Sequence, residues 1–329
     1  MNNKLSCLIN DYQKNIKSAV VLMQRSGIEM PFSRASWIEM DIPLCGELDG
    51  GIPYFKHGAG CEVNLAAGRI DFDFGEQGEI GGVDVWRLLQ FSKGRLLDYG
   101  FESEAEVERC FEDAIAKGSL IYSGYCLYYV ANAPRILATD VDCRLPDDIL
   151  PSRDKDPILT LYAHYFLAAD LMRENYAKID RQLKKTGKLS RNNEINLRIY
   201  LSSWLGFLAV TCAGFRDLKV RFLLKDDRPE GFAELISIAD SIGRLMNIHA
   251  DSLRKYRNKV FHLRENSEEI RSFFAKDAER LPWARELHTA IAEFFSQYRV
   301  LCEVHYILYG RKSEIISSKT PKYRSLSCE

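Results

Sequence analysis

The segment CRLPDDILPSRDKDP, residues 143–157, constrains the fold more than any other stretch of the sequence. It holds three prolines and four aspartates, and proline interrupts helices as well as interior strands, so the segment is predicted to be a linker. Apolar residues follow a period of two before it and a helical period after it. We therefore expect an acidic α+β domain over residues 1–145 with a sensing or regulatory role, an all-helical bundle over 156–310, and a flexible tail over 311–329.

The first domain is predicted to contain both helices and strands. Residues 4–25 repeat apolar side chains at helical spacing before Gly27, which indicates a helix. Residues 70–74 alternate isoleucine or phenylalanine with aspartate, as a strand with one buried face does. Together with CEVNL and the short AAG turn, they predict a β-hairpin over residues 61–75. Two more helices and one more strand are expected over the following ranges: 83–94, 103–118 and 119–131.

The second domain is predicted to be a bundle of about five helices. Its apolar residues recur at steps of three and four, and its connections are short and polar. The expected helices cover these ranges: 158–185, 194–224, 231–248, 252–263 and 281–310. The fold class is therefore α+β, with the strands confined to the first domain.

Charge is divided unevenly between the two domains. The net charge of the whole chain is −1, yet residues 1–150 carry 14 Lys and Arg against 23 Asp and Glu, whereas residues 178–264 carry 18 against 9. A basic excess that spans several elements favours a polyanionic ligand for the second domain. Solvated helix faces would produce the same counts, so charge alone does not decide whether the ligand is a nucleic acid.

Other sequence features point to a protein of the cytoplasm. The longest apolar run, residues 200–215, is short for a membrane span, and the N-terminus lacks the layout of a signal peptide. None of the nine cysteines forms a C-x-x-C pair, which argues against a zinc site and a disulfide framework.

The sequence RNKVFH, residues 257–262, combines an arginine, an asparagine and a histidine at the end of an amphipathic helix. Arg257 falls at the margin of the apolar stripe, next to Tyr256, and His262 lies about 140° further around an ideal helix. Two side chains so far apart converge on one phosphate only if the helix ends between them or a second chain completes the site. The structural alternative is a helix end, with His262 interacting with the helix dipole and Arg257 paired with an acid.

The RNKVFH motif, on a late helix of a basic helical domain, resembles that of the HEPN ribonuclease domains over residues 157–308. The resemblance implies that Arg257 and His262 are the catalytic pair, that Asn258 assists the arginine, and that two motif helices meet across a homodimer. It also implies a role in prokaryotic antiviral defence or toxin–antitoxin systems. The surrounding cations are expected to bind RNA: Arg254, Lys255, Lys259 and Arg264.

This chemistry is consistent with the residue types. Histidine titrates near neutrality and can act as the acid or the base for attack by a 2′-hydroxyl, while the planar donors of arginine suit a phosphoryl group that gains charge. The predicted function is therefore a metal-independent endoribonuclease, a hydrolase that needs no cofactor. One departure from the family is that the apolar middle of residues 201–215 lacks the acidic partner that some members have.

A second stretch, FKHGAGCEVNLAAGRIDFDFGEQGEIGGVDVWRL, offers groups that could bind a metal: His57, Cys61, Glu62, Asp71, Asp73 and Asp84. No calcium loop or phosphate-binding glycine spacing is present, and the aspartates alternate as those of a half-exposed strand do, so a structural role is favoured.

The stretch resembles an uncharacterised bacterial domain, over about residues 8–130, that often stands near polymorphic toxin and immunity genes. That resemblance leaves a second function open. The chain could be a non-enzymatic immunity or adaptor protein that binds a protein partner through its acidic domain.

Overall fold

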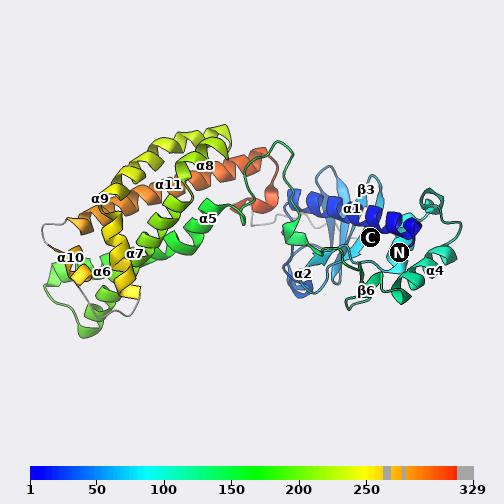
Figure 1. The fold of residues 1–329 in the computed structure, drawn as a ribbon, viewed down its shortest axis with the longest axis horizontal. Helices are drawn as coiled ribbons and strands as arrows, with labels where there is room; N and C mark the ends of the chain where they lie inside the picture. The colour runs from blue at the N-terminus through cyan, green and yellow to red at the C-terminus, as the bar shows by residue number, and fades with distance from the viewer. Residues whose placement is uncertain (262–267, 276–278, 317–329) are drawn as a thin grey trace. The chain divides into compact units, whose positions relative to one another are not determined.

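The computed structural model describes residues 1–261, 268–275 and 279–316, which divide into two compact units (Figure 1). Unit 1 comprises residues 1–145 and the C-terminal segment from Tyr306, and unit 2 comprises residues 146–305. Strands occur in unit 1, whereas the described residues of unit 2 form helices and connections without a strand. The predicted α+β class is therefore confirmed.

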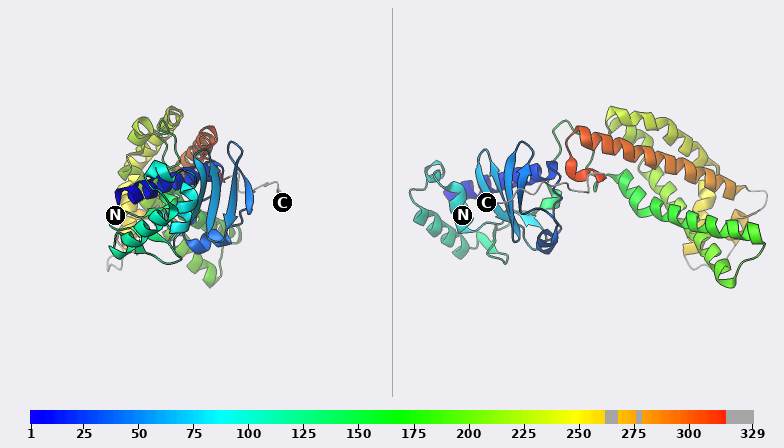
Figure 2. Two further views of the ribbon diagram at one scale, coloured as in Figure 1. Left: turned by 90° about the vertical axis from the view of Figure 1, so that its right-hand side faces the viewer. Right: turned by 180° about the vertical axis from the view of Figure 1, so that it is seen from behind.

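The sheet of unit 1 is a four-stranded antiparallel meander (Figure 2). Its strands follow the order of the chain: β1 (Cys45–Leu48), β2 (Ile52–His57), β3 (Gly60–Leu65) and β4 (Gly68–Asp73). The predicted hairpin is the β3–β4 pair, in which Cys61 faces Phe72 and Val63 faces Ile70. These four side chains are fully buried, as the period of two requires for one face of the hairpin.

Helix α1 (Asn3–Arg25) packs on β4 and supplies much of the core of unit 1. Its buried stripe repeats at steps of three and four, as predicted from the sequence, and consists of Leu5, Leu8, Ile9, Tyr12, Ile16, Val20 and Met23. The other helices of this unit are α2 (Arg34–Glu39), α3 (Val85–Ser92) and α4 (Glu104–Ala116). The last two confirm the helices expected over 83–94 and 103–118.

The strand expected over residues 119–131 is wrong in detail, because the chain folds into a short hairpin there. Strands β6 (Leu120–Tyr122) and β7 (Tyr128–Val130) pair antiparallel. The turn between them holds Gly124, Tyr125 and Cys126 at positive φ, which reverses the chain. A further pair joins β5 (Glu79–Ile80) to β8 (Ile136–Leu137).

The described residues of unit 2 form four long α-helices and three of fewer than eight residues. They are α5 (Pro157–Leu161), α6 (Leu167–Thr186), α7 (Arg191–Asp217), α8 (Val220–Asp226), α9 (Ile236–Phe261), α10 (Glu268–Phe273) and α11 (Arg280–Leu308). Two expected helices, 231–248 and the described part of 252–263, are one continuous helix, α9. The helix expected over 194–224 is instead divided into α7 and α8 by Lys219, which has a left-handed φ of 48°.

Helix α7 is long and apolar enough to cross a lipid bilayer by length and composition alone. It packs against α6 and α9, however, and Trp204, Leu205 and Leu208 on it are fully buried. A central position in the bundle accounts for its apolar composition.

Two polar groups of side chains lie inside the bundle. Asp156 caps the N-terminus of α5, and its buried carboxylate also accepts hydrogen bonds from Arg228 at 3.1 Å and Tyr298 at 2.6 Å. His288 on α11 lies between Asp170 of α6 and Trp204 of α7. Buried polar groups are retained at little cost only when they are paired in this way.

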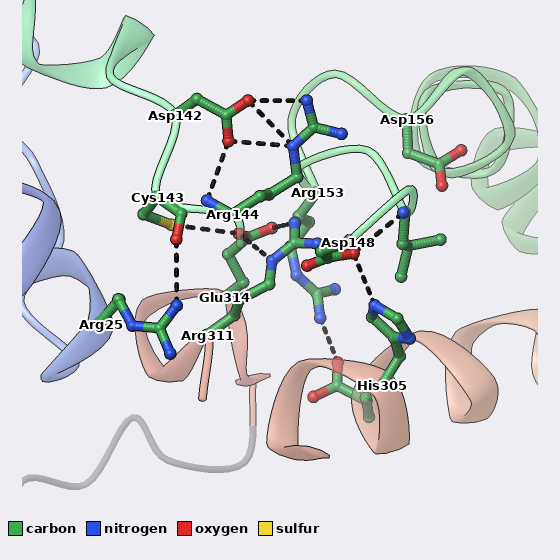
Figure 3. Close-up of polar contacts among 12 residues, drawn as sticks. Arg25, Asp142, Cys143, Arg144, Asp148, Arg153, Asp156, His305, Arg311 and Glu314 are labelled. Carbon is green, nitrogen blue, oxygen red and sulfur yellow. Dashed lines mark hydrogen bonds and ion pairs between the residues drawn. The ribbon is translucent and has the colours of Figure 1, made fainter. Parts of the chain in front are cut away.

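The predicted linker is held to α11 within unit 2. His305 donates a hydrogen bond to the buried carboxylate of Asp148 at 2.8 Å, and Arg153 pairs with Glu303 (Figure 3). The proline-rich segment therefore lacks regular structure, as predicted, but its side chains anchor it.

The segment expected to be a flexible tail is ordered over its first residues. Arg311 is fully buried and donates two hydrogen bonds to Glu314, at 2.8 and 2.7 Å (Figure 3), and Arg25 of α1 donates to the carbonyl of Tyr309 at 3.2 Å. The described residues that follow α11, 309–316, thus belong to unit 1 and not to the bundle. A bidentate arginine–carboxylate pair explains this order. Residues 317–329 lie outside the described residues.

Candidate active site at the end of helix α9

The motif arginine lies in the last described turn of α9. Leu253 and Tyr256, on the apolar stripe before it, are buried, whereas Arg257 and Asn258 are half-buried. Arg257 is thus at the margin of the stripe, as the helical wheel predicts. His262 lies outside the described residues, so its distance from Arg257 stays a prediction.

Asn258 orients the guanidinium of Arg257. Its side-chain oxygen Oδ1 accepts hydrogen bonds from Nε at 3.1 Å and from Nη2 at 2.7 Å. Among the residues that the structure describes, no carboxylate lies within 4.0 Å of this guanidinium. The acid partner that the structural alternative expects is therefore absent from that part of the chain.

The other cations expected to bind RNA have different surroundings. Lys255 and Arg254 are exposed, and Arg254 approaches Asp251, one turn earlier, at 3.8 Å. Lys259 is half-buried. Arg264 lies outside the described part of the chain.

The end of α9 packs against helix α7. Tyr256 donates a hydrogen bond to the Ser202 hydroxyl at 3.2 Å, and the Phe261 ring packs on Gly206 so closely that a Cβ there would approach it to 2.0 Å. Residues 201–215 contain no acidic residue. The hydrogen bond of α7 to Tyr256 of α9 comes instead from Ser202. These two contacts join the end of α9, which carries the motif arginine, to α7.

Unit 1 brings together polar side chains that the sequence had assigned to structure. We call His57, Asp71, Asp73, Asp84 and Arg87 the His57 cluster. Nε2 of His57 donates to Asp71 at 2.9 Å, and its Nδ1 lies 3.9 Å from Asp73. Arg87 on α3 pairs with Asp73 at 3.1 Å and also with Asp84, the N-cap of that helix.

The electrostatics of the cluster favour a charged imidazole. The hydrogen bond to Asp71 raises the pKa of His57, against the opposing effect of burial. Burial works against ionisation of Asp71 too, but His57 and Arg87 outweigh it and lower the pKa of this carboxyl. Arg34 lies 3.6 Å from Asp73, so with His57 and Arg87 three positive side chains face the three carboxylates.

A metal site is not formed by these groups. Cys61 is fully buried, which raises the pKa of its thiol to about 12, and Glu62 pairs with Arg69 outside the cluster. Within residues 1–261, 268–275 and 279–316, no group of three His, Cys, Asp or Glu side chains could hold a metal ion. Arg87 was missed by the sequence interpretation. The available signal was its position three residues after the helix-capping Asp84, where the two side chains face each other.

Comparison with known proteins places the His57 cluster inside a family region. A family model described as a domain of unknown function (DUF6896) matches residues 5–130, the greater part of unit 1. No curated protein and no solved structure matches the chain. The family match therefore leaves the activity of unit 2 to be inferred from its own residues.

Proposed function

We propose that the chain is a metal-independent endoribonuclease of a prokaryotic defence or toxin system, active in the cytoplasm through Arg257 and His262. The observation that carries this proposal is the half-buried guanidinium of Arg257, which Asn258 orients and which has no carboxylate partner among the described residues. Such a group can stabilise negative charge that develops on a phosphoryl oxygen. It stands at the end of a helix that contacts α7 through Tyr256 and Phe261.

In the proposed reaction a 2′-oxygen of the RNA attacks the adjacent phosphorus, and the 5′-oxygen leaves. His262 takes the proton of the 2′-hydroxyl or gives one to the leaving 5′-oxygen, water makes the other proton transfer, and Arg257 stabilises the charge on the phosphoryl group. The products would end in a 2′,3′-cyclic phosphate and a 5′-hydroxyl. A strand that lacks the 2′-hydroxyl would resist cleavage.

The test is cleavage of a labelled single-stranded RNA by the full chain in the presence of EDTA. We expect His262→Ala to lose about 10²–10⁴-fold in rate, because proton transfer typically contributes that much. Arg257→Lys should also be impaired, because an ammonium group cannot reproduce the fork of donors. Arg285→Lys makes the same change at an exposed arginine of α11 and serves as the matched control. Intact RNA after incubation with the wild type, or full activity of Arg257→Lys, would overturn the proposal.

A homodimeric site can be tested by mixing inactive variants. If Arg257 of one chain acts with His262 of another, Arg257→Ala and His262→Ala subunits complement each other after exchange. Random exchange makes half of the dimers mixed, and each mixed dimer has one intact site, so about a quarter of the wild-type rate should return. No recovery, with exchange verified by differently tagged subunits, would place each site within a single chain.

The alternative is a non-enzymatic adaptor or immunity protein that binds a protein partner through its acidic domain. The observation in its favour is a set of exposed apolar side chains in unit 1, among them Phe32, Ile38 and Leu44. It predicts that neither the wild type nor any Arg257 variant cleaves RNA. The cleavage assay above therefore separates the two functions.

A further inference from the structure

An open basic groove lies in unit 2 where the end of α7, α8 and the middle of α9 meet. Its volume is about 470 Å³. We call it the α8 groove and define it by Arg216, Lys219, Arg221, Phe222, Gly243 and Arg244, which are among its lining residues. The RNKVFH motif is not part of it.

The charge of the α8 groove suits an anionic ligand. Four cations line it, and the acid among the lining residues, Asp240, pairs with Arg221 at 3.1 Å. Arg216, Lys219 and Arg244 are exposed, so their charges face solvent without the desolvation cost of buried ions. A concave surface with one sign of charge concentrates ligands of the opposite sign.

The groove also presents an aromatic ring. Phe222 on α8 is 62% exposed, and it lines the groove together with the four cations. Cationic grooves with exposed aromatic side chains are the common design of sites for single-stranded nucleic acid, because the cations follow the phosphates and the ring stacks on a base.

The backbone around the groove carries two unusual features. Lys219 has a φ of 48°, a conformation that costs free energy for a residue other than glycine, and it makes the corner between α7 and α8. Gly243 lies inside α9, where glycine costs about 1 kcal/mol relative to alanine. A Cβ at Gly243 would meet nothing within 4 Å.

Two glycines of α7 have close neighbours, unlike Gly243. A Cβ at Gly206 would approach Phe261 to 2.0 Å, and one at Gly214 would approach Leu161 to 2.4 Å, so close helix packing requires both. Gly243 has no such neighbour, and what its missing side chain provides is space at the wall of the α8 groove.

We propose that the α8 groove binds single-stranded RNA, with its cations on the phosphates and Phe222 stacked on a base. Gly243 and Arg257 are fourteen residues apart on α9, which corresponds to about 21 Å along the axis and about 40° around it. Ala250 and Leu253 lie directly between them and are buried, so a strand held in the groove would reach the motif along the exposed margin of α9, past Asn247 and Arg254. This inference rests on the proposed ribonuclease function for its ligand, and it makes the groove the place where the substrate is held before cleavage.

The test measures binding apart from cleavage. A fluorescein-labelled 2′-O-methyl oligonucleotide of twelve uridines resists attack by a 2′-oxygen, so its anisotropy with the full chain reports affinity alone. We expect Arg216→Gln with Lys219→Gln to weaken binding about tenfold and to lower the slope of log K against log salt by about 1.4, the loss expected for two phosphate contacts. Phe222→Ser should weaken binding at least about fivefold through lost stacking.

Two further variants keep the test specific. Lys185→Gln with Arg191→Gln removes two positive charges from exposed positions at the ends of α6 and α7, and it should leave both affinity and slope unchanged. Gly243→Ala should raise the melting temperature, because alanine favours a helix, and should still weaken binding. An unchanged affinity in the groove variants, an equal loss in the charge control, or a more stable Gly243→Ala with normal binding would overturn the inference.

The two proposals fail in different ways. If the groove variants lose affinity but the wild type cleaves no RNA, the groove stands and the ribonuclease does not. If the wild type cleaves RNA and the groove variants bind and cleave normally, the ribonuclease stands and the groove does not.

Discussion

Two histidines, His57 in unit 1 and His288 in unit 2, each form a hydrogen bond with an aspartate, yet their pKa values are shifted in opposite directions. Each ring donates its Nε2–H to an aspartate, at 2.9 Å for His57 and 3.0 Å for His288. The other ring nitrogen distinguishes them. Nδ1 of His57 faces the carboxylate of Asp73 at 3.9 Å, whereas Nδ1 of His288 accepts the indole N–H of Trp204 at 3.2 Å.

The difference shows that a carboxylate neighbour does not by itself charge a histidine. The pKa of His57 is raised, because its hydrogen bond to Asp71 outweighs burial. Burial lowers the pKa of His288 to about 4, despite the hydrogen bond to Asp170. An indole N–H can only donate, so the nitrogen that faces it must keep its lone pair, and the ring of His288 stays neutral.

The largest expected consequence is acid sensitivity of the bundle. A folded pKa of about 4 against an ordinary value of 6.5 means that the unfolded chain binds this proton first as pH falls. The stability associated with neutral His288 is thus complete above pH 6.5 and is lost toward pH 4, a change of about 3 kcal/mol. Urea unfolding of the full chain, read by pulsed hydrogen exchange on peptides of unit 2, measures it.

His57→Asn provides the control for that measurement. It removes a titrating histidine from unit 1 and should leave the acid dependence of the peptides from unit 2 as it is in the wild type. An NMR titration in which the ring of His288 takes up a proton near pH 6.5 in the folded protein would refute the assignment.

A smaller effect should follow from changing either partner of His288. Trp204→Phe removes the donor to Nδ1, so the pKa of His288 should rise, and the acceptor left without a partner should cost about 1–3 kcal/mol. Asp170→Asn removes the carboxylate, so the pKa should fall further. Ring NMR shifts of His288 across a pH series would reveal both, and shifts in the same direction for the two variants would contradict this account.

The sequence predicted the elements of both units better than their polar contacts. The stripe of α1 and the hairpin of β3 and β4 follow from apolar periods that local residues set. The turn at Tyr125 and Cys126 was missed because non-glycine residues rarely adopt a positive φ, and no local pattern marks them. Residues 249–251 were read as a break, yet α9 runs through them, because a few polar residues fit the solvent face of a helix.

The His57 cluster shows where such prediction ends. The alternation of residues 70–74 indicated correctly that Asp71 and Asp73 share the face opposite Phe72. It could not indicate what covers that face, since Arg87 comes from a helix more than ten residues away in the sequence. The alternation of apolar and polar residues shows which side chains share a face of the strand. Only the tertiary fold decides whether water or an arginine contacts that face.

The smallest expected effect is alkaline sensitivity in unit 1. Because the folded pKa of His57 is raised, its contribution to stability is complete below the unfolded value of 6.5 and is lost as pH rises through the folded pKa. The ring is partly exposed to solvent, so the loss should be below about 1 kcal/mol, or about 2–4 °C in melting temperature for a unit of this size.

The full chain and His57→Gln should be compared at pH 6 and pH 8.5 by thermal unfolding, with hydrogen exchange on peptides from β2 and β4 to assign the transition. Arg69→Gln, which breaks an exposed ion pair between β3 and β4 of the same sheet, is the matched control and should keep the pH dependence of the wild type. If His57→Gln loses as much stability between the two pH values as the wild type does, His57 is not the charged partner of Asp71, and the contrast between the two histidines fails on this side.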